Sequence, residues 1–237
     1  MLQIEQLVKR RGTRMVLDRI GFRAQSGRVT AFLGPNGAGK SSTLRILLGL
    51  DRADDGMALV GGRPYRSLRD PLRTVGSMLD GSGAHRSRTA RDHLAWVARS
   101  NGIPRRRVGE VLEQVGLAES GQVRVGRYSL GMGQRLGLAA ALLGEPDALV
   151  LDEPVNGLDP GGIRWIRGLL RGHADAGGTV LLSSHLMSEV AGIADDLVVI
   201  SDGRIAAAGT LEEVTAGYAG LEDAFFALTA RDQETAR

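Results

Sequence analysis

The clearest pattern in the chain is a set of short, unbroken apolar runs. They are "VTAFLG" at 29–34, "ALVLDE" at 148–153, "TVLLSS" at 179–184 and "LVVIS" at 197–201. Each run is too short for a typical helix, and β-branched residues are present, so the runs predict strands. Apolar residues without alternation are typical of strands that are covered on both faces of a parallel sheet.

Segments with helical spacing lie between these predicted strands, notably at 40–49, 160–175 and 186–194. This alternation predicts an α/β fold in which helices flank a mainly parallel sheet. The residues before 30 and those around 56–66 look like short strands with glycine turns. We expect them to form an antiparallel β edge.

Residues 86–145 have a different pattern, with apolar positions at helical spacing throughout. "TARDHLAWVARS" opens with a possible capping box from Thr89 to Asp92. No linker-like composition flanks this region, so we interpret it as a helical insert at about 81–145 in a single domain of residues 1–230. The remaining segment, 231–237, is polar and is expected to be a flexible tail.

Composition narrows the classes of function. The 237 residues include no cysteine, which excludes disulfides, thiolate zinc sites and cysteine nucleophiles. No apolar tract is long enough to cross a bilayer, and the N-terminal stretch is too short and too charged for a signal peptide, so we expect a cytoplasmic location.

The net charge is only +3, and the one dense basic run is Arg105-Arg106-Arg107. A solvated helix face is the preferred interpretation of this run, and contact with acidic lipid, RNA or a protein partner is the alternative. Only Trp96 lies nearby as a stacking platform, so we expect no nucleic-acid partner.

"GPNGAGKS" at 34–41 satisfies the pattern G-x-x-x-x-G-K-[ST] between a predicted strand and a predicted helix. Glycines let backbone N–H groups turn inward around a phosphate, and the helix N-terminus adds its dipole. Lys40 is one of only two lysines in a chain with 28 arginines, and it is expected to reach the β- and γ-phosphates. The alternative is a chance glycine-rich turn. The predicted nucleotide contacts are Asn36, Gly37, Gly39, Lys40, Ser41 and Ser42.

Two acids, Asp152 and Glu153, end the second predicted strand. We expect Asp152 and the Ser41 hydroxyl to hold Mg²⁺, and Glu153 to act as the general base that polarises the attacking water. Taken alone, these acids could equally be an ordinary strand end. His185 follows the third predicted strand, at the sheet edge where ligands bind in open α/β folds.

Ser129 precedes a predicted helix in "RYSLGMGQRL", which by itself indicates an N-cap and a second helix N-terminus for a phosphate. The ordered set "GPNGAGKS", "YSLGMGQR", "LVLDEP", "NGLDP" and "SSH" resembles the ATP-binding cassette (ABC) ATPases along nearly the whole chain. "YSLGM" replaces the commoner L-S-G-G-Q form of that family. This variant, the "LEDAFFALT" ending and the arginine-rich style are similar to the ATPase subunits of bacterial drug-resistance or antibiotic-type exporters.

The resemblance implies a P-loop NTPase fold with a RecA-like core, and a head-to-tail homodimer or heterodimer with two ATP molecules and Mg²⁺ at its interface. It also implies an integral-membrane permease as a separate chain, which holds this subunit on the inner face of the cell membrane and engages the helical insert. In each site Lys40, Ser41, Asp152, Glu153 and His185 of one subunit are expected to meet Ser129 and Gly131 of the other. Asp159 is expected to cross the interface and couple the sites.

Two positions depart from the family pattern. Arg11 stands where the family usually has an aromatic residue that stacks on adenine, and a guanidinium can also stack on a base. Asp80 aligns with a glutamine that contacts Mg²⁺, so it is expected either to ligate the metal or to be a loop residue in a shifted alignment.

An ATP-hydrolysing exporter subunit is therefore the predicted function. A GTPase would require an N-K-x-D motif, which is absent, and a DNA-repair or translation-factor cassette would require a longer chain. The remaining alternative is a cassette with weak turnover that acts as a regulatory or structural subunit. Arg11 and Asp80 favour this alternative, while Glu153 and His185 oppose it.

Overall fold

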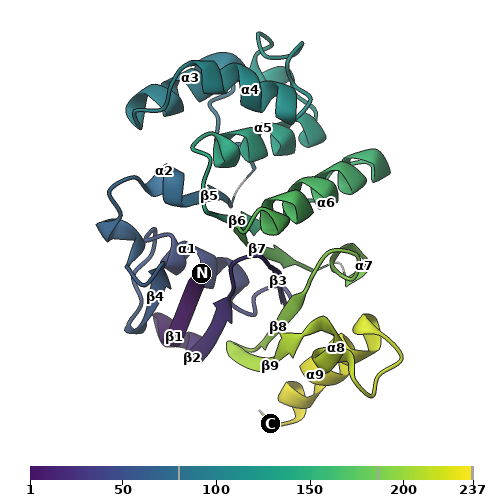
Figure 1. Cartoon of the computed structure of the whole chain (residues 1–237). Helices are drawn as coiled ribbons and strands as arrows, with labels where there is room; N and C mark the ends of the chain where they lie inside the picture. Colours follow the sequence, from purple (N-terminus) through teal and green to yellow (C-terminus); the bar gives the residue numbers. More distant parts are fainter. Residues whose placement is uncertain (80, 186, 236–237) are drawn as a thin grey trace.

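The computed structural model describes residues 1–79, 81–185 and 187–235 (Figure 1). Asp80, for which a magnesium contact is predicted, lies outside the described residues. The strands are β1 (Leu2–Arg11), β2 (Arg14–Ala24), β3 (Val29–Leu33), β4 (Asp55–Val60), β5 (Val75–Met78), β6 (Ala148–Asp152), β7 (Thr179–Ser184), β8 (Asp196–Ser201) and β9 (Arg204–Thr210). The helices are α1 (Lys40–Leu47), α2 (Pro71–Thr74), α3 (Ala90–Ser100), α4 (Arg106–Gln114), α5 (Leu130–Leu142), α6 (Pro160–Asp175), α7 (Met187–Val190), α8 (Leu211–Thr215) and α9 (Leu221–Thr235), and short 3-10 turns lie at Tyr65–Ser67 and Val125–Arg127.

The larger sheet has the strand order β5-β6-β7-β3-β8-β9. Its first five strands are mutually parallel, and β9 pairs antiparallel with β8. The four strands predicted from unbroken apolar runs are β3, β6, β7 and β8, which lie side by side in the interior of this sheet. The predicted α/β class with a mainly parallel sheet is confirmed.

Both faces of this sheet are covered, which explains the absence of alternation in its strands. On β6, Val150 belongs to a buried cluster that the antiparallel strands and α1 complete. Leu149 and Leu151 belong to a second buried cluster, which contains α3, α4, α5 and α6. Since successive side chains of a strand point to opposite faces, a strand between two apolar layers needs an apolar residue at every position.

The N-terminal strands form a sheet of their own, in the order β2-β1-β4, with antiparallel pairing. The prediction of antiparallel strands in this region is confirmed, but two details of it are wrong. β1 and β2 have 10 and 11 residues, so they are not short, and they do not edge the parallel sheet. Register shifts and positive φ values at Gln6 and Arg19 interrupt these long strands, which hides their alternation in the sequence.

The sequence did not predict the strands β5 and β9, and one predicted helix is shorter in the structure. β5 includes Gly76, and β9 is rich in alanine, so neither has a strong strand pattern. A side chain at position 76 would collide with the Ala141 carbonyl, which is why glycine is needed in this strand. The helix predicted at 186–194 is limited to α7, after which the N–H groups of Ile193 and Ala194 both bond to the Val190 carbonyl in a turn.

Helices α3, α4 and α5 lie together, separate from the antiparallel sheet (Figure 1). Thr89 caps α3 by accepting the Asp92 N–H at 3.1 Å, as the sequence predicts. However, the Asp92 carboxylate accepts the Thr89 hydroxyl, so the capping box is incomplete. A complete capping box is found instead at Thr210 and Glu213. No helix within the described ranges is both long enough and apolar enough to cross a membrane.

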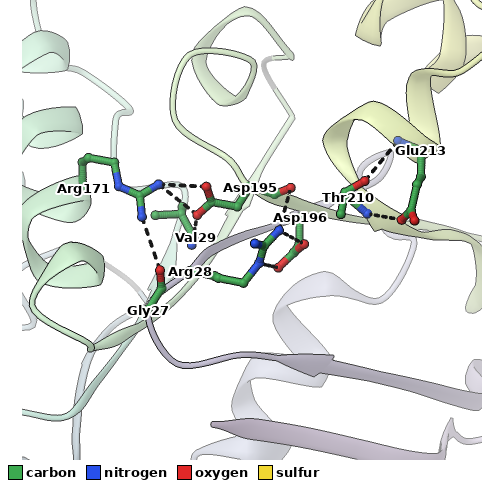
Figure 2. A network of polar contacts seen from close by, with 8 residues as sticks. All are labelled: Gly27, Arg28, Val29, Arg171, Asp195, Asp196, Thr210 and Glu213. Carbon is green, nitrogen blue, oxygen red and sulfur yellow. Dashed lines mark hydrogen bonds and ion pairs between the residues drawn. The ribbon is translucent and has the colours of Figure 1, made fainter.

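A polar network joins three elements at the amino ends of the parallel strands (Figure 2). Arg171 of α6 donates to both carboxylate oxygens of Asp195, at 3.0 and 2.9 Å. Asp195 also accepts the Val29 N–H at 2.8 Å, and beside it Arg28 forms a two-bond ion pair with Asp196 at 2.7 and 2.6 Å. The network therefore links α6 to the starts of β3 and β8.

We expect the Asp195→Asn variant to lower the free energy of unfolding by about 2 kcal/mol at pH 7, because it weakens hydrogen bonds to a charged group. Burial raises the pKa of Asp195, but the Val29 N–H and Arg171 lower it by more, so its pKa in the folded protein is below the ordinary value. A carboxylate of this kind stabilises the fold above the unfolded pKa, and this contribution is lost as pH falls through the folded pKa. Urea unfolding between pH 7 and pH 3 should therefore show a shrinking difference between variant and wild type.

The matched control is Asp223→Asn, which makes the same change at an exposed residue of α9 that has no ion pair in the described part of the chain. This control should unfold like the wild type throughout. An Asp195→Asn deficit that stays constant down to pH 3 would contradict the role of the charge.

Candidate nucleotide site

The loop at residues 34–39 connects β3 to α1 and has the glycine geometry that its sequence predicts. Gly37 and Gly39 adopt φ values of 82° and 118°, which side-chain-bearing residues rarely adopt. A Cβ at Gly34 would lie 2.4 Å from the Ile200 carbonyl oxygen. Helix α1 begins at Lys40 without a side-chain cap, so its first N–H groups remain available to an anion.

Lys40 is 7% exposed, although it carries a charged group. Its ammonium donates to the Gly34 carbonyl at 2.5 Å and to the Pro35 carbonyl at 3.3 Å. Burial lowers the pKa of Lys40, and the nearby carboxylates of Glu153 and Asp152 partly oppose this shift. The loop thus holds a desolvated cation beside the helix N-terminus, which is an arrangement suited to a phosphate.

The two predicted magnesium ligands in the described part of the chain are in contact. The Ser41 hydroxyl donates to one Asp152 oxygen at 2.7 Å, and the Ser183 hydroxyl donates to the other. A hydroxyl and a carboxylate at the end of the phosphate loop fit Mg²⁺, which is usually bound through one or two carboxylates together with phosphate oxygens. Ser183, which the sequence interpretation did not single out, lies in the "SSH" segment opposite Asp152 in the β6–β7 register.

Glu153 and His185 lie together at the ends of adjacent strands, as the sequence predicts. Glu153 Oε2 is 2.8 Å from His185 Nδ1, and the His185 side chain is 43% exposed. The Glu153 N–H is anchored on Ser183, at 3.1 Å from its hydroxyl and 3.2 Å from its carbonyl. Glu153 has φ at 50°, an unusual left-handed conformation for this residue type, and its neighbours hold it there.

Ser129, Gly131 and Asp159 lie apart from this group. Ser129 is the N-cap of α5 and accepts the Met132 N–H at 3.2 Å, which confirms the predicted cap. Asp159 is the N-cap of α6 and accepts the Gly162 N–H at 2.7 Å. Between Ser129 and Gly131, the Leu130 side chain is 69% exposed and lies against Gly157. The structure therefore gives these residues local contacts within the chain and does not bring them to Lys40.

A cavity of about 470 Å³ lies over the phosphate loop. Its walls include all six predicted nucleotide contacts of the loop and helix, together with Asp152, Glu153 and the predicted base contact Arg11. Arg14 and Val16 of β2 also line it, and the sequence interpretation did not include them. Ser129, Gly131, Asp159 and His185 are not part of its lining in the described chain.

Comparison with known proteins shows the family of this chain. The model of the ABC transporter family matches residues 17–156. The lantibiotic transport ATP-binding protein SrtF of Streptococcus pyogenes is 38% identical over 225 residues, which are 95% of this chain and 96% of that protein. The bacitracin transport ATP-binding protein BcrA of Bacillus licheniformis is 38% identical over 216 residues, which are 90% of this chain and 69% of that protein.

Solved structures agree with this assignment. The structure of an ATP-binding subunit of an ABC transporter has a TM-score of 0.87 and 26% identity, and the match covers 96% of this chain and 99% of that one. A dimeric bacterial ABC transporter cassette has a TM-score of 0.81 at 20% identity, covering 89% of this chain and 98% of that one, and this likeness concerns the fold alone. The family match over more than half of the chain and the relatives at 38% identity show that the chain belongs to the ABC transporter family, as one of its ATP-hydrolysing subunits.

Proposed function

We propose that this chain is the ATPase subunit of an antibiotic-type exporter, working as a dimer that drives a separate membrane permease. The observation that carries the proposal is the position of Glu153 between the phosphate-loop cavity and His185, with Oε2 2.8 Å from Nδ1. A carboxylate at this place can accept a proton from a water molecule that attacks the γ-phosphate.

Within one copy, different residues would bind the phosphates, hold the metal ion and orient Glu153. Lys40 and the first N–H groups of α1 would bind the phosphates, since both carry positive charge at the end of the loop. Ser41 and Asp152 would hold Mg²⁺, and the ion would neutralise negative charge on the phosphates. His185 would orient Glu153 through Nδ1 and could contact the γ-phosphate with its other nitrogen.

A second copy would complete the site. Ser129 lies at the N-terminus of α5, and neither it nor Gly131 lines the cavity of its own chain. Ser129 and Gly131 would therefore be able to approach a phosphate bound in the site of a partner copy. The N-terminus of α5 would then face the negative charge of that phosphate. Asp159 starts the next helix after Glu153 and would connect the two sites. ATP binding would then close the dimer, and phosphate release would open it.

The proposed cargo and membrane partner rest on the relatives. SrtF and BcrA are described as transport ATP-binding proteins for a lantibiotic and for bacitracin. By analogy, this chain would serve an exporter of antibiotic-type compounds and would bind a permease on the cytoplasmic face through residues 81–145. These residues would act as a helical insert within one ATPase domain.

Affinity purification of the tagged chain from its native membranes tests this proposal. We expect an integral-membrane protein to co-purify, and the complex to hydrolyse ATP in the presence of Mg²⁺. A chain that recovers a permease but shows no turnover above that of its Glu153→Gln variant would instead act as a regulatory or structural cassette.

A further inference from the structure

The tip of the β1–β2 hairpin carries two arginines directly opposite each other. Arg11 ends β1 and Arg14 begins β2, and the two are register partners across a turn in which Gly12 has φ at 61°. Like charges at directly opposite positions of an antiparallel pair destabilise it. A bound group that interacts with both guanidinium groups would offset this cost.

This hairpin tip forms one wall of the nucleotide cavity. Arg11, Arg14 and Val16 are the residues of β1 and β2 that line it, and no aromatic side chain of the described chain joins them. The wall therefore offers a nucleobase two guanidinium planes and one aliphatic side chain. The other walls of the cavity come from the phosphate loop, the start of α1 and the end of β6, so the hairpin tip is the wall that remains for a base once the phosphates occupy the loop.

The side chains of Arg11 and Arg14 differ in their contacts with the rest of the chain. Arg11 forms an ion pair with Asp51 at 3.8 Å, while its side chain stays 61% exposed. Asp51 is fixed in turn by Arg45 at 2.9 Å, so Arg11 is tethered at one side. The Arg14 side chain is exposed and has no hydrogen bond or ion pair to any residue that the structure describes. Arg11 is thus suited to present a plane, and Arg14 is suited to donate hydrogen bonds.

The hydrogen-bonding chemistry of this wall distinguishes the purines. A guanidinium has five N–H donors and no acceptor. Guanine presents two acceptors, O6 and N7, on one edge, which match a two-bond contact from arginine. Adenine presents N7 beside its N6 amino group, which is a donor and would face another donor. A stacking contact from Arg11 does not distinguish the bases, because every base has a π-face.

We propose that Arg11 and Arg14 bind the nucleobase and that this ATPase accepts GTP at least as well as ATP. Arg14 reads the O6 and N7 edge of guanine, while Arg11 stacks on the base. The inference rests on the proposed function, because it assigns the base end of the same cavity whose phosphate end contains Lys40.

Isothermal titration calorimetry with the β,γ-imido analogues of ATP and GTP tests this inference without turnover. In the wild type we expect the two dissociation constants to agree within about threefold, or the GTP analogue to bind more tightly.

Arg14→Gln should weaken binding of the GTP analogue about tenfold, which is the effect of one lost two-bond contact. It should weaken binding of the ATP analogue less than about twofold. Arg11→Ala should weaken both analogues by a similar factor. Arg10→Gln is the matched control, since it removes the same charge from the same hairpin outside the cavity lining, and it should change neither constant.

The outcomes separate this inference from the proposed function. A GTP analogue that binds more than about tenfold more weakly than the ATP analogue in the wild type overturns the inference. Equal weakening of both analogues by Arg14→Gln also overturns it, because it would indicate a phosphate contact. In both cases Lys40-dependent binding of the ATP analogue would leave the ATPase assignment intact. Failure of both analogues to bind, or unchanged binding in Lys40→Ala, would reject the nucleotide site itself.

Discussion

Replacing Glu153 by Gln should lower the rate of ATP hydrolysis about a hundredfold or more and leave ATP binding unchanged. Glutamine keeps the size of the side chain and can still bond to His185 Nδ1, but it cannot accept a proton from water. The backbone of residue 153 is held by Ser183 independently of the carboxylate, so the variant should fold normally. Phosphate release at saturating ATP measures turnover, equilibrium dialysis measures binding, and gel filtration should show an accumulated ATP-bound dimer.

Glu145→Gln is the matched control for this variant. Glu145 also has a left-handed backbone, with φ at 53°, and its side chain is 67% exposed outside the nucleotide cavity. The control makes the same chemical change at a residue with the same rare conformation, and it should hydrolyse ATP like the wild type. A fully active Glu153→Gln protein that remains monomeric with ATP would reject both the general base and the shared site.

The Ser129→Arg variant should abolish ATP hydrolysis and leave nucleotide binding by the monomer unchanged. Ser129 lies outside the cavity of its own chain, so a local effect on the Lys40 site is not expected. A long cationic side chain at the N-terminus of α5 would keep that helix from approaching the partner's phosphate. Turnover and dialysis measurements on the same preparation separate the two effects.

Loss of the helix cap must be separated from loss of the shared site, because Ser129 accepts the Met132 N–H. Thr89→Arg is the matched control, since Thr89 caps α3 by the same kind of bond at 3.1 Å. Each variant should lose about 1 kcal/mol of stability. Only Ser129→Arg should lose turnover, and wild-type activity in that variant would count against the role of Ser129 in a partner's site.

Most of the parallel sheet could be predicted because β3, β6, β7 and β8 are interior strands, and an interior strand requires apolar residues at every position. β5 and β9 were missed because each contains small residues, which weaken the strand pattern. At Gly76 the cause is the Ala141 carbonyl, which leaves no room for a side chain. The partition into two sheets could not be inferred, because it depends on which strands share an apolar layer and not on any local pattern.

The phosphate-binding half of the site was accessible from sequence because its residues are adjacent in the chain and have a fixed spacing. Ser183 and Arg14 were missed because each acquires its place only through pairing with another strand, Ser183 opposite Asp152 and Arg14 opposite Arg11. The left-handed backbone at Glu153 also had no signal in the sequence, because glutamate does not favour that conformation.

The central claim is that each ATP is hydrolysed by residues from two copies of the chain, and mixing two inactive variants tests it most directly. A Ser129→Arg copy keeps Lys40 and Glu153, while a Glu153→Gln copy keeps Ser129, so a mixed dimer contains one intact site. After unfolding and refolding an equal mixture, random pairing makes about half of the dimers mixed, and turnover should recover to about a quarter of the wild-type rate. Turnover no higher than that of the two variants refolded separately would contradict the shared site.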